Sequence, residues 1–469
     1  MKKFYNKNLL ATIALVMAAA PAASAEEDLS GGFFYLNEDW YGHNNSTINY
    51  LRPDDPDGNY WEYRVFKTRN PGKELGCTAQ DGIAWGGRLY LIAKQEKDPG
   101  ASVTGARITV CDYTTMKCIA QLTNIDPSGA RCDGRGVVGV SRDKVYISST
   151  NGVWVFDTHT NTVIKQIAGT ENPNGNSDQD ATNPSGSLYH GQCGAMVLSG
   201  KYVFIAHQTY GVQVVDAATD QIVKTIDFKQ LGDDIGVGSL IKDRNGVIWA
   251  GVNGSISSSY GETMSYVVRI DPVALEPEFI ELDASVPQPT NSWYAWTPDC
   301  MCASMKNDYI YWKGDAGYFM WYQSSQVVRF NTVTRQAETI IETGGTYTSK
   351  DRYIYGSSMR IHPVTDEIYI AVNQDTGVNK YWTRRYSSSG ELLKEYNMVK
   401  SYWFPSLPIF TENDDKSTTG IGDITIPNTD INAAPEYFDL QGRRINPENA
   451  PAGIYIERRG AKTQKILLR

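Results

Sequence analysis

The sequence predicts an all-β fold, a seven-bladed β-propeller closed by N- and C-terminal strands and followed by a small C-terminal β segment. The composition favours strands and tight turns, because the chain has 42 Gly and 29 Tyr residues and only 21% of its residues are charged. A strand–turn–strand pattern recurs along the chain, and a second hairpin follows each copy. Four short antiparallel strands per repeat form a propeller blade.

The N-terminus has the features of a secretory signal peptide over residues 1–25. Lysines near its start supply positive charge, residues 9–20 are apolar, and residues 23–25 (Ala-Ser-Ala) form a small-residue cleavage site. The apolar run is shorter than the roughly 20 residues that span a membrane, so no transmembrane segment is predicted. Because no Cys follows it, we do not expect a lipoprotein. We expect a mature chain that begins near Glu26 and is found in the periplasm, at the cell surface or outside the cell.

Six copies of the first hairpin recur at intervals of about 45 to 60 residues, the period of a propeller blade or slightly longer. They begin at Asp81, Gly136, Gly194, Gly238, Cys302 and Ser357. The strands that follow each copy often end in Asp or Asn, as at residues 212–216. Such a side chain can bond the backbone of the next turn, so a return strand and a four-stranded unit are expected.

The two ends of this region supply a seventh blade. Residues 33–37 resemble the second strand of the repeat, and residues 46–51 and 61–66 would be its third and fourth strands. The missing innermost strand would be residues 406–410, from the other end of the region. Strands from both ends would then close the ring within one sheet, which protects the sheet edges.

These patterns give the domain organisation. The propeller covers residues 26–410, and residues 411–435 form a linker rich in Asp, Asn, Thr, Pro and Gly. Residues 436–469 contain three short strand patterns joined by Gly turns. About 35 residues are too few for a robust core. We expect this C-terminal β tail to dock on the propeller or to act as a sorting segment.

Charge and cysteine content limit the partners and the chemistry. The net charge of −9 and the absence of a basic stripe argue against nucleic acid as a partner. Seven Cys residues in an exported chain favour disulfides. Cys111 and Cys118 flank a turn, and in a hairpin they would face each other, so we expect them to be bonded. The odd count leaves one thiol free or paired elsewhere.

The predicted topology sorts the loops onto two faces. Loops that lead into the innermost strands, or join the second and third strands, emerge on one face, the entry face; the others emerge on the opposite exit face. Six of the 11 Trp residues fall in entry-face loops, which favours a binding surface. The alternative is that long loops pack together around these side chains as a local core. The predicted ligand-binding residues are Trp40, Tyr41, Asn44, Asn45, His190, Tyr210, Trp293, Trp296, Trp321, Tyr322 and Trp382.

Catalytic and metal motifs are not evident. The chain has only five His residues and no nucleophile elbow, phosphate loop or His-Glu-x-x-His motif, so no catalytic residue is predicted. Residues 300–302 and 190–193 contain metal-ligand types, but their spacing differs from common zinc motifs. The acidic stretches 54–59 and 172–180 depart from the twelve-residue calcium loop. We therefore predict no metal and no certain cofactor.

Several motifs carry a resemblance to a known family. From residue 31 to 410 the chain resembles the YncE-like propellers, whose repeat looks like residues 215–226. Residues 32–50 resemble the opening of the surface cobalamin-binding propellers of Bacteroidetes, with an Asn-Glu strand end before a Gly-Asn-rich loop. Residues 437–444 and 453–456 resemble C-terminal segments of exported proteins from that phylum. The relatives are lipoproteins, whereas this chain lacks a lipobox Cys and has extra Cys and longer aromatic loops.

The resemblance implies a non-enzymatic propeller that captures a ligand on one face. With the aromatic loops, it predicts an exported binding protein whose ligand is a cobamide-like cofactor, a glycan or a partner protein of the envelope, such as an outer-membrane transporter. The alternative is a propeller-fold hydrolase, lyase or cyclotransferase with its active site at the same face. That alternative requires His43, His190 or His207 to lie beside carboxylates.

Overall fold

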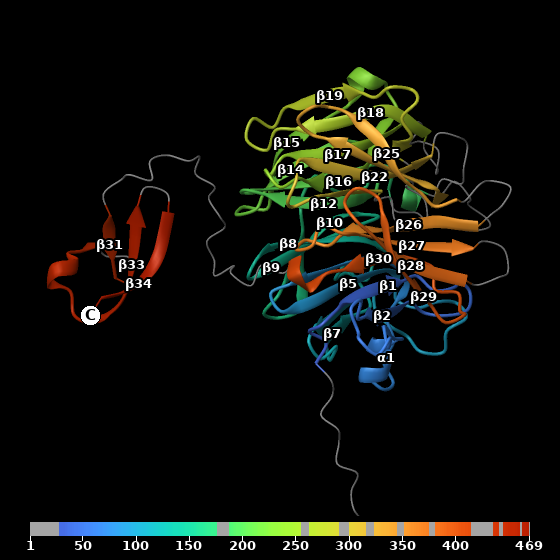
Figure 1. Ribbon diagram of the computed structural model, residues 1–469, viewed down its shortest axis with the longest axis horizontal. Coiled ribbons are helices and arrows are strands. Elements are labelled where there is room, and N and C mark those ends of the chain that lie inside the picture. Colours follow the sequence, from blue (N-terminus) through green and yellow to red (C-terminus); the bar gives the residue numbers. More distant parts are fainter. Residues whose placement is uncertain are drawn as a thin grey trace, which may run out of the picture.

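The computed structural model describes most of the chain after the N-terminal segment. The described residues are 28–175, 187–254, 262–289, 300–315, 323–344, 351–374, 380–413, 435–439, 444–459 and 462–468. They form an all-β, propeller-like arrangement of antiparallel sheets (Figure 1). Among these residues no helix has the length and apolar character that crossing a membrane requires.

Seven sheets are formed by the described residues between 33 and 409. The sheet that joins the two ends of this region contains, in order, β30 (Pro405–Ile409), β1 (Phe33–Asn37), β2 (Thr47–Leu51) and β3 (Trp61–Glu62). The second contains β4 (Cys77–Trp85), β5 (Arg88–Gln95), β6 (Ile108–Asp112) and β7 (Cys118–Leu122). The third contains β8 (Gly134–Ser141), β9 (Lys144–Ser149), β10 (Gly152–Asp157) and β11 (Thr162–Gln166).

The remaining four sheets follow along the chain. The fourth contains β12 (Cys193–Ser199), β13 (Tyr202–His207), β14 (Gly211–Asp216) and β15 (Gln221–Ile226). The fifth contains β16 (Ile235–Lys242), β17 (Ile248–Gly254), β18 (Glu262–Ile270) and β19 (Pro277–Glu281). The sixth contains β20 (Gln288–Pro289), β21 (Met301–Ala303), β22 (Tyr309–Asp315), β24 (Gln326–Asn331) and β25 (Ala337–Glu342). The seventh contains β23 (Gln323–Ser324), β26 (Asp351–Ile361), β27 (Ile368–Gln374), β28 (Lys380–Tyr386) and β29 (Leu392–Asn397).

Helices are short. The α-helix α1 spans Val65–Arg69, and single 3-10 turns lie at Ser187–Tyr189, Lys229–Leu231, Thr411–Asn413 and Pro447–Asn449. An eighth sheet near the C-terminus contains β31 (Glu436–Phe438), β32 (Arg444–Ile445), β33 (Gly453–Arg459) and β34 (Lys462–Leu468). The sequence predicts three strands for this tail, and the structure has four.

Each sheet of the main body packs both of its faces against neighbouring sheets. In β13, Val203 and Ile205 belong to the apolar cluster shared with the third sheet, whereas Phe204 and Ala206 belong to the cluster shared with the fifth. Successive strand residues point to opposite sides, so alternation places every second side chain in a different interface. A strand that is apolar on both sides is therefore buried on both faces, as the repeat predicts.

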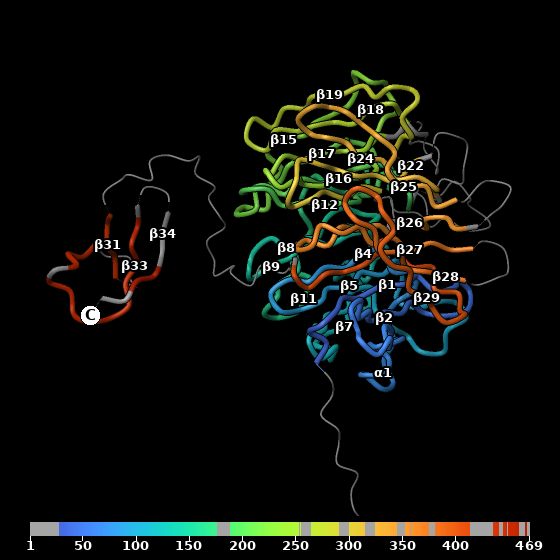
Figure 2. The backbone as a smooth tube through the Cα atoms, viewed as in Figure 1, coloured from blue at the N-terminus to red at the C-terminus, as the bar shows by residue number. Residues whose placement is uncertain are grey.

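Strands from the two ends of the main body share one sheet, as the sequence predicts. β1 pairs antiparallel with β30, with Phe34 opposite Ile409 and Leu36 opposite Leu407. Figure 1 shows β1 and β30 side by side although they lie 370 residues apart, and in Figure 2 the two segments are found by their blue and orange-red colours. The innermost strands of the seven sheets contact one another in the order β30, β4, β8, β12, β16, β21, β26 and back to β30.

The predicted fourth strand at residues 61–66 is wrong beyond its first residues. β3 ends at Glu62, and α1 follows within the same segment. Arg64 adopts a left-handed conformation with φ of 55°, and its backbone N–H donates to Asn49 Oδ1 at 2.9 Å. This conformation interrupts the extended chain, so the strand cannot continue through Phe66.

The predicted disulfide is also wrong. Cys111 and Cys118 lie opposite each other in the β6–β7 hairpin, as expected, but all seven Cys residues are free thiols. The register shifts between Val110 and Cys111, which offsets the pair. Cys111 is fully buried in the core, whereas Cys118 is partly exposed and accepts a hydrogen bond from Lys73 Nζ at 3.4 Å.

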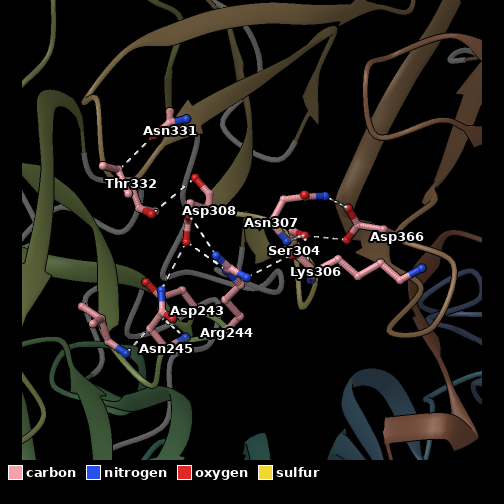
Figure 3. Close-up of polar contacts among 12 residues, drawn as sticks. Asp243, Arg244, Asn245, Ser304, Lys306, Asn307, Asp308, Asn331, Thr332 and Asp366 are labelled. Atoms are coloured by element: carbon pink, nitrogen blue, oxygen red, sulfur yellow. Dashed lines mark hydrogen bonds and ion pairs between the residues drawn. The ribbon is translucent and has the colours of Figure 1, made fainter. Parts of the chain in front are cut away.

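Turns on the exit face connect neighbouring sheets through polar contacts (Figure 3). Arg244, in the turn after β16, forms two 2.9 Å bonds to the Asp308 carboxylate before β22. In the same turn before β22, Ser304 Oγ and Asn307 Nδ2 donate to Asp366 at 2.6 and 2.9 Å. Asp366 is buried and follows β26. These contacts join the fifth, sixth and seventh sheets at short, rigid turns.

Candidate functional site

The loop between β1 and β2, residues 38–46, carries the exposed aromatic side chains of the entry face. Its start is fixed by backbone bonds from Glu38 and Asp39 to the carbonyls of Phe404 and Trp403 at 2.9 and 3.0 Å. Trp40 is 39% exposed, and the next residue, Tyr41, is 60% exposed. Two adjacent exposed rings on an anchored loop form an apolar contact surface that the fold itself leaves uncovered.

Trp40 is held in place by its aromatic neighbours. Its ring centroid lies 3.7 Å from that of His43 and 4.1 Å from that of Tyr402. Tyr402 in turn stacks on Phe404 at 6.2 Å. The loop aromatics therefore pack together, as expected if they form a local core. Part of the Trp40 ring nevertheless remains exposed and can contact a ligand.

A cavity of about 220 Å³ lies beside this group, between the loop, α1 and residues 98–105. His43 and Asn44 are exposed and line one side. The rest of the lining includes the apolar side chains of Ile48, Phe66 and Leu75 and a larger set of polar ones, namely Asp39, Asn45, Ser46, Thr47, Arg64, Lys67, Glu74 and Ser102. The cavity therefore offers both hydrogen-bond donors and hydrogen-bond acceptors next to Trp40.

Two residues of this cavity have strained backbones. Asp39 and Arg64 adopt left-handed conformations with φ of 57° and 55°. The Asp39 carboxylate accepts a bond from Thr47 Oγ1 at 2.5 Å, and burial raises the pKa of Asp39 to about 7. Non-glycine residues in this conformation cost energy and concentrate at functional sites.

Asn45 has a structural role. Its Nδ2 donates to Glu74 Oε2 at 2.9 Å and to the Val103 carbonyl at 2.8 Å. Its Oδ1 accepts the Asp98 backbone N–H at 2.8 Å. These bonds tie residues 98–105 to the β1–β2 loop, so the amide that was expected to contact ligand instead shapes the cavity wall.

Buried and half-buried charged residues lie where three strands reach the entry face. Glu38 follows β1, Lys94 is near the end of β5, and Asp133 and Arg135 flank the start of β8. We call these four residues the mouth cluster. Sequence analysis did not find them, because single charged residues at strand ends resemble ordinary solvated positions. Their burial is visible only once neighbouring sheets are in place.

Tyrosine hydroxyls bond both carboxylates of the mouth cluster, and Arg107 and Arg131 also lie 3.5 and 3.6 Å from Asp133 Oδ1. The Tyr355 hydroxyl donates to Glu38 Oε2 at 3.1 Å, and the Tyr189 hydroxyl donates to Asp133 Oδ2 at 2.7 Å. Glu38 Oε1 is buried and has no hydrogen-bond partner among the described residues. A buried acceptor without a partner is costly, so this oxygen is available to a donor that a ligand supplies.

The cations of the mouth cluster are held by neutral groups as well. Arg135 Nη1 donates to Gln80 Oε1 at 2.6 Å, and both residues are buried. Lys94 Nζ lies 4.3 Å above the Tyr189 ring, within the range of a cation–π interaction. Gln80 and Tyr189 thereby help to fix the two cations at the wall of the mouth.

Burial shifts the protonation of this cluster. It raises the pKa of Glu38 to about 8, and it lowers the pKa of Lys94 to about 8 and that of Arg135 to about 10. Near neutral pH, Glu38 therefore keeps its proton, and Lys94 and Arg135 outweigh Asp133. Burial also raises the pKa of Tyr41.

His43 lines the same cavity as Asp39 and Glu74, whereas His190 and His207 make no side-chain bond to a carboxylate among the described residues. His159 and His362, outside the entry-face loops, lie 2.7 and 3.8 Å from Asp143 and Glu412. His207 is fully buried, and its Nδ1 accepts the backbone N–H groups of Thr209 and Tyr210 at 3.1 and 3.4 Å. Burial lowers the pKa of His207 to about 4, so the ring stays neutral. His190 is partly exposed, and its carbonyl accepts a bond from Asn174.

The other predicted contact residues are dispersed. Tyr210 is 37% exposed and packs on His207 with ring centroids 4.5 Å apart. Trp382 lies in β28, where it packs against the core beside Arg352. The remaining four fall outside the described residues, namely Trp293, Trp296, Trp321 and Tyr322. Within the described ranges, no group of three or more His, Cys, Asp or Glu side chains is arranged to hold a metal.

Comparison with known proteins assigns a family but no activity. No curated protein matches the chain. A solved structure of the computationally designed Ika8 protein is similar with a TM-score of 0.41 and 11% identity, over 80% of this chain and 91% of that chain. A chain of the Mitotic Checkpoint Complex is similar with a TM-score of 0.39 and 14% identity, over 84% and 90%. Similarity this low carries no information on function. The model of the DUF5074 family, described as a domain of unknown function, matches residues 31–411, so the chain belongs to that family.

Proposed function

We propose that this protein is an exported, non-enzymatic binding protein built on a seven-bladed β-propeller, and that it captures a glycan on its entry face. The ring is supported by the contacts that link the first strands of seven successive sheets and return to β30. Pairing of β1 with β30 supports closure by strands from both ends of the main body. The resemblance to YncE-like propellers is part of the same proposal.

One observation carries the choice of function: exposed Trp40 and Tyr41 belong to the loop whose residues 39 and 43–46 line a polar cavity and whose first residue, Glu38, belongs to the mouth cluster. A sugar ring has an apolar C–H face, which packs on an aromatic ring, and hydroxyl groups that donate and accept hydrogen bonds. Asp39 and Glu38 offer acceptors, while Arg64 and Lys94 offer donors. A hydroxyl-rich ligand can bond to both the acceptors and the donors, whereas an apolar ligand would leave these groups without a ligand bond.

The size of the cavity separates a glycan from a larger cofactor. A cavity of about 220 Å³ is below the usual range for enclosed small-molecule sites, roughly 300 to 1,000 Å³. It can enclose one sugar unit, with further units lying across Trp40 and Tyr41. A cobamide would remain largely outside it. A partner protein is the other outcome that the test below distinguishes.

The test is direct binding by the mature chain, residues 26–469. An oligosaccharide array would identify the glycan, and isothermal titration calorimetry would then measure its affinity for the wild type, Tyr41→Ala and Trp40→Ala. Removing either aromatic contact should weaken binding by about tenfold or more, since hot-spot aromatic residues contribute about 2 kcal/mol or more. Tyr309→Ala, which changes a partly exposed ring near the exit face, is the matched control. Unchanged affinity in the first two variants would reject the site.

Localisation is proposed from residues 1–25 and has its own test. Expression in a bacterial host with fractionation should place the protein outside the cytoplasm, and N-terminal sequencing of the exported product should begin near Glu26. Retention in the cytoplasm with an intact N-terminus would contradict export without bearing on the glycan site.

A further inference from the structure

A second cavity occupies the centre of the ring and opens toward the exit face. Its volume is about 420 Å³, and it is lined by β4, β8, β12, β16, β21, β26 and β30. The lining includes Trp85, Leu198, Lys242, Ile361 and Ile409, each at or next to the end of its strand. Those strand ends lead into the exit-face turns, so this end of the cavity lies away from the entry-face loops; toward the other end the lining includes Arg135 of the mouth cluster.

The wall of this central cavity is mainly apolar. Ile83, Val138, Met196 and Ile241 contribute to it, and Met305, at the rim, is 47% exposed. An apolar cavity with an open mouth fits an apolar body, because transfer of that body out of water is favourable.

Small residues keep the wall open. A side chain at Gly82 would place its Cβ 2.6 Å from Ile409 Cδ1, and one at Gly139 would place it 2.2 Å from the Trp85 ring. Trp85 is fixed by a 2.9 Å bond from its Nε1 to the Ser141 carbonyl. The shape of the cavity is therefore set by closely packed, hydrogen-bonded side chains.

The lining of the central cavity carries more basic than acidic side chains. Its charged residues are Asp81, Arg135, Lys242 and Arg360. The Asp81 carboxylate accepts the backbone N–H groups of Gly82 and Val137 at 2.8 and 3.0 Å, so its charge is stabilised within the fold. Lys242 and Arg360 lie at or next to the last residues of β16 and β26, near the open end. An anion at this end would meet two cations.

We propose that the central cavity is a second ligand site, which takes a small molecule with an apolar body and an anionic head group. The apolar body lies against Met196, Leu198 and Ile241, and the head group lies at the rim between Lys242 and Arg360. A cationic molecule of the same size would face two like charges. The site does not depend on the proposed glycan function, since the two lie toward opposite faces.

The test uses decanoate as the probe and decyltrimethylammonium as its cationic counterpart, both below their micelle concentrations. Calorimetric titration of residues 26–469 should show one equivalent of decanoate bound and at least tenfold weaker binding of the cation. The double variant Lys242→Gln, Arg360→Gln should lose about tenfold in decanoate affinity, since each partly exposed ion pair contributes up to about 1 kcal/mol. Lys201→Gln, an exposed lysine of an exit-face turn outside the lining, should change nothing.

A blocking variant tests the position of the apolar body. Ala303→Phe adds a ring to the cavity wall and should abolish decanoate binding while the glycan affinity of the entry face is kept. The proposal is overturned if the wild type binds no decanoate, if it binds both probes equally, or if the double charge variant binds decanoate as the wild type does. Because the charge changes lie at the rim, folding of that variant can be verified by an unchanged thermal transition.

Discussion

Glu38→Gln should remove a large part of the pH dependence of stability. Glu38 is buried after β1 and has a pKa raised to about 8 by burial. In the unfolded chain a Glu side chain loses its proton near its ordinary pKa of about 4.3. Between these values the folded state holds a proton that the unfolded state has released. Stability must therefore fall as pH rises through this window, and a neutral Gln, which still accepts the Tyr355 bond, removes that fall.

The magnitude follows from the pKa values. Between about pH 6.5 and 8, a group with a folded pKa of about 8 lowers the free energy of unfolding by about 2 kcal/mol. Asp39, with a pKa raised to about 7, adds about 1 kcal/mol. His207, whose pKa is lowered to about 4, and Lys94, whose pKa is lowered to about 8, each offset about 0.4 kcal/mol of this loss over the same range.

Urea unfolding followed by tryptophan fluorescence at several pH values would measure this effect. The wild type should lose about 2 kcal/mol between about pH 6.5 and 8, and Glu38→Gln should lose almost none. Glu391→Gln, at an exposed position, should follow the wild type. Equal slopes for the wild type and Glu38→Gln would refute the claim that burial keeps Glu38 protonated.

Three other perturbations test the packing. Gly139→Ala should lower the free energy of unfolding by about 1–3 kcal/mol, because its Cβ would lie 2.2 Å from the Trp85 ring; an unchanged urea midpoint would contradict this packing. Asp366→Ala should cost about 1–3 kcal/mol, because the buried Ser304 hydroxyl and the Asn307 amide lose their acceptor. Arg244→Ala, in an exposed ion pair, should have a much smaller effect that salt removes; similar losses for the two variants would refute the distinction. In the native protein Cys118 should react first with a thiol reagent, and unfolding should expose all seven thiols; fewer than seven would indicate a disulfide.

The sequence predicts the strands well because their burial follows a simple periodicity. The alternating apolar residues of β13 face two different sheets, and the hairpins recur at a nearly constant interval. Residues 33–37 lack a preceding partner strand in the sequence, which correctly indicates a partner from residues 406–410. The end of β3 was not predicted because it depends on the left-handed conformation of Arg64. Arginine has no preference for that conformation, so the residue type gives no signal of it.

The candidate site was predicted in part. Aromatic composition correctly indicated Trp40 and Tyr41 as exposed entry-face residues. It also selected Asn45, whose amide is used within the fold. The mouth cluster could not be predicted, because the burial of Glu38 and Lys94 arises from contacts between separate sheets. The central cavity arises in the same way, since residues from seven strands enclose it.

The central claim is that the entry face binds a glycan, and a thermal-shift screen of the mature chain tests it most directly. Glycans, cobamides and divalent metals would be compared for the wild type and Tyr41→Ala. At a concentration about 100 times its dissociation constant, a ligand stabilises the folded state by about 2.7 kcal/mol. The account predicts a concentration-dependent rise in Tm with one glycan, and a much smaller rise for Tyr41→Ala. A rise with a cobamide or a metal but no glycan, or an equal rise in both proteins, would contradict it.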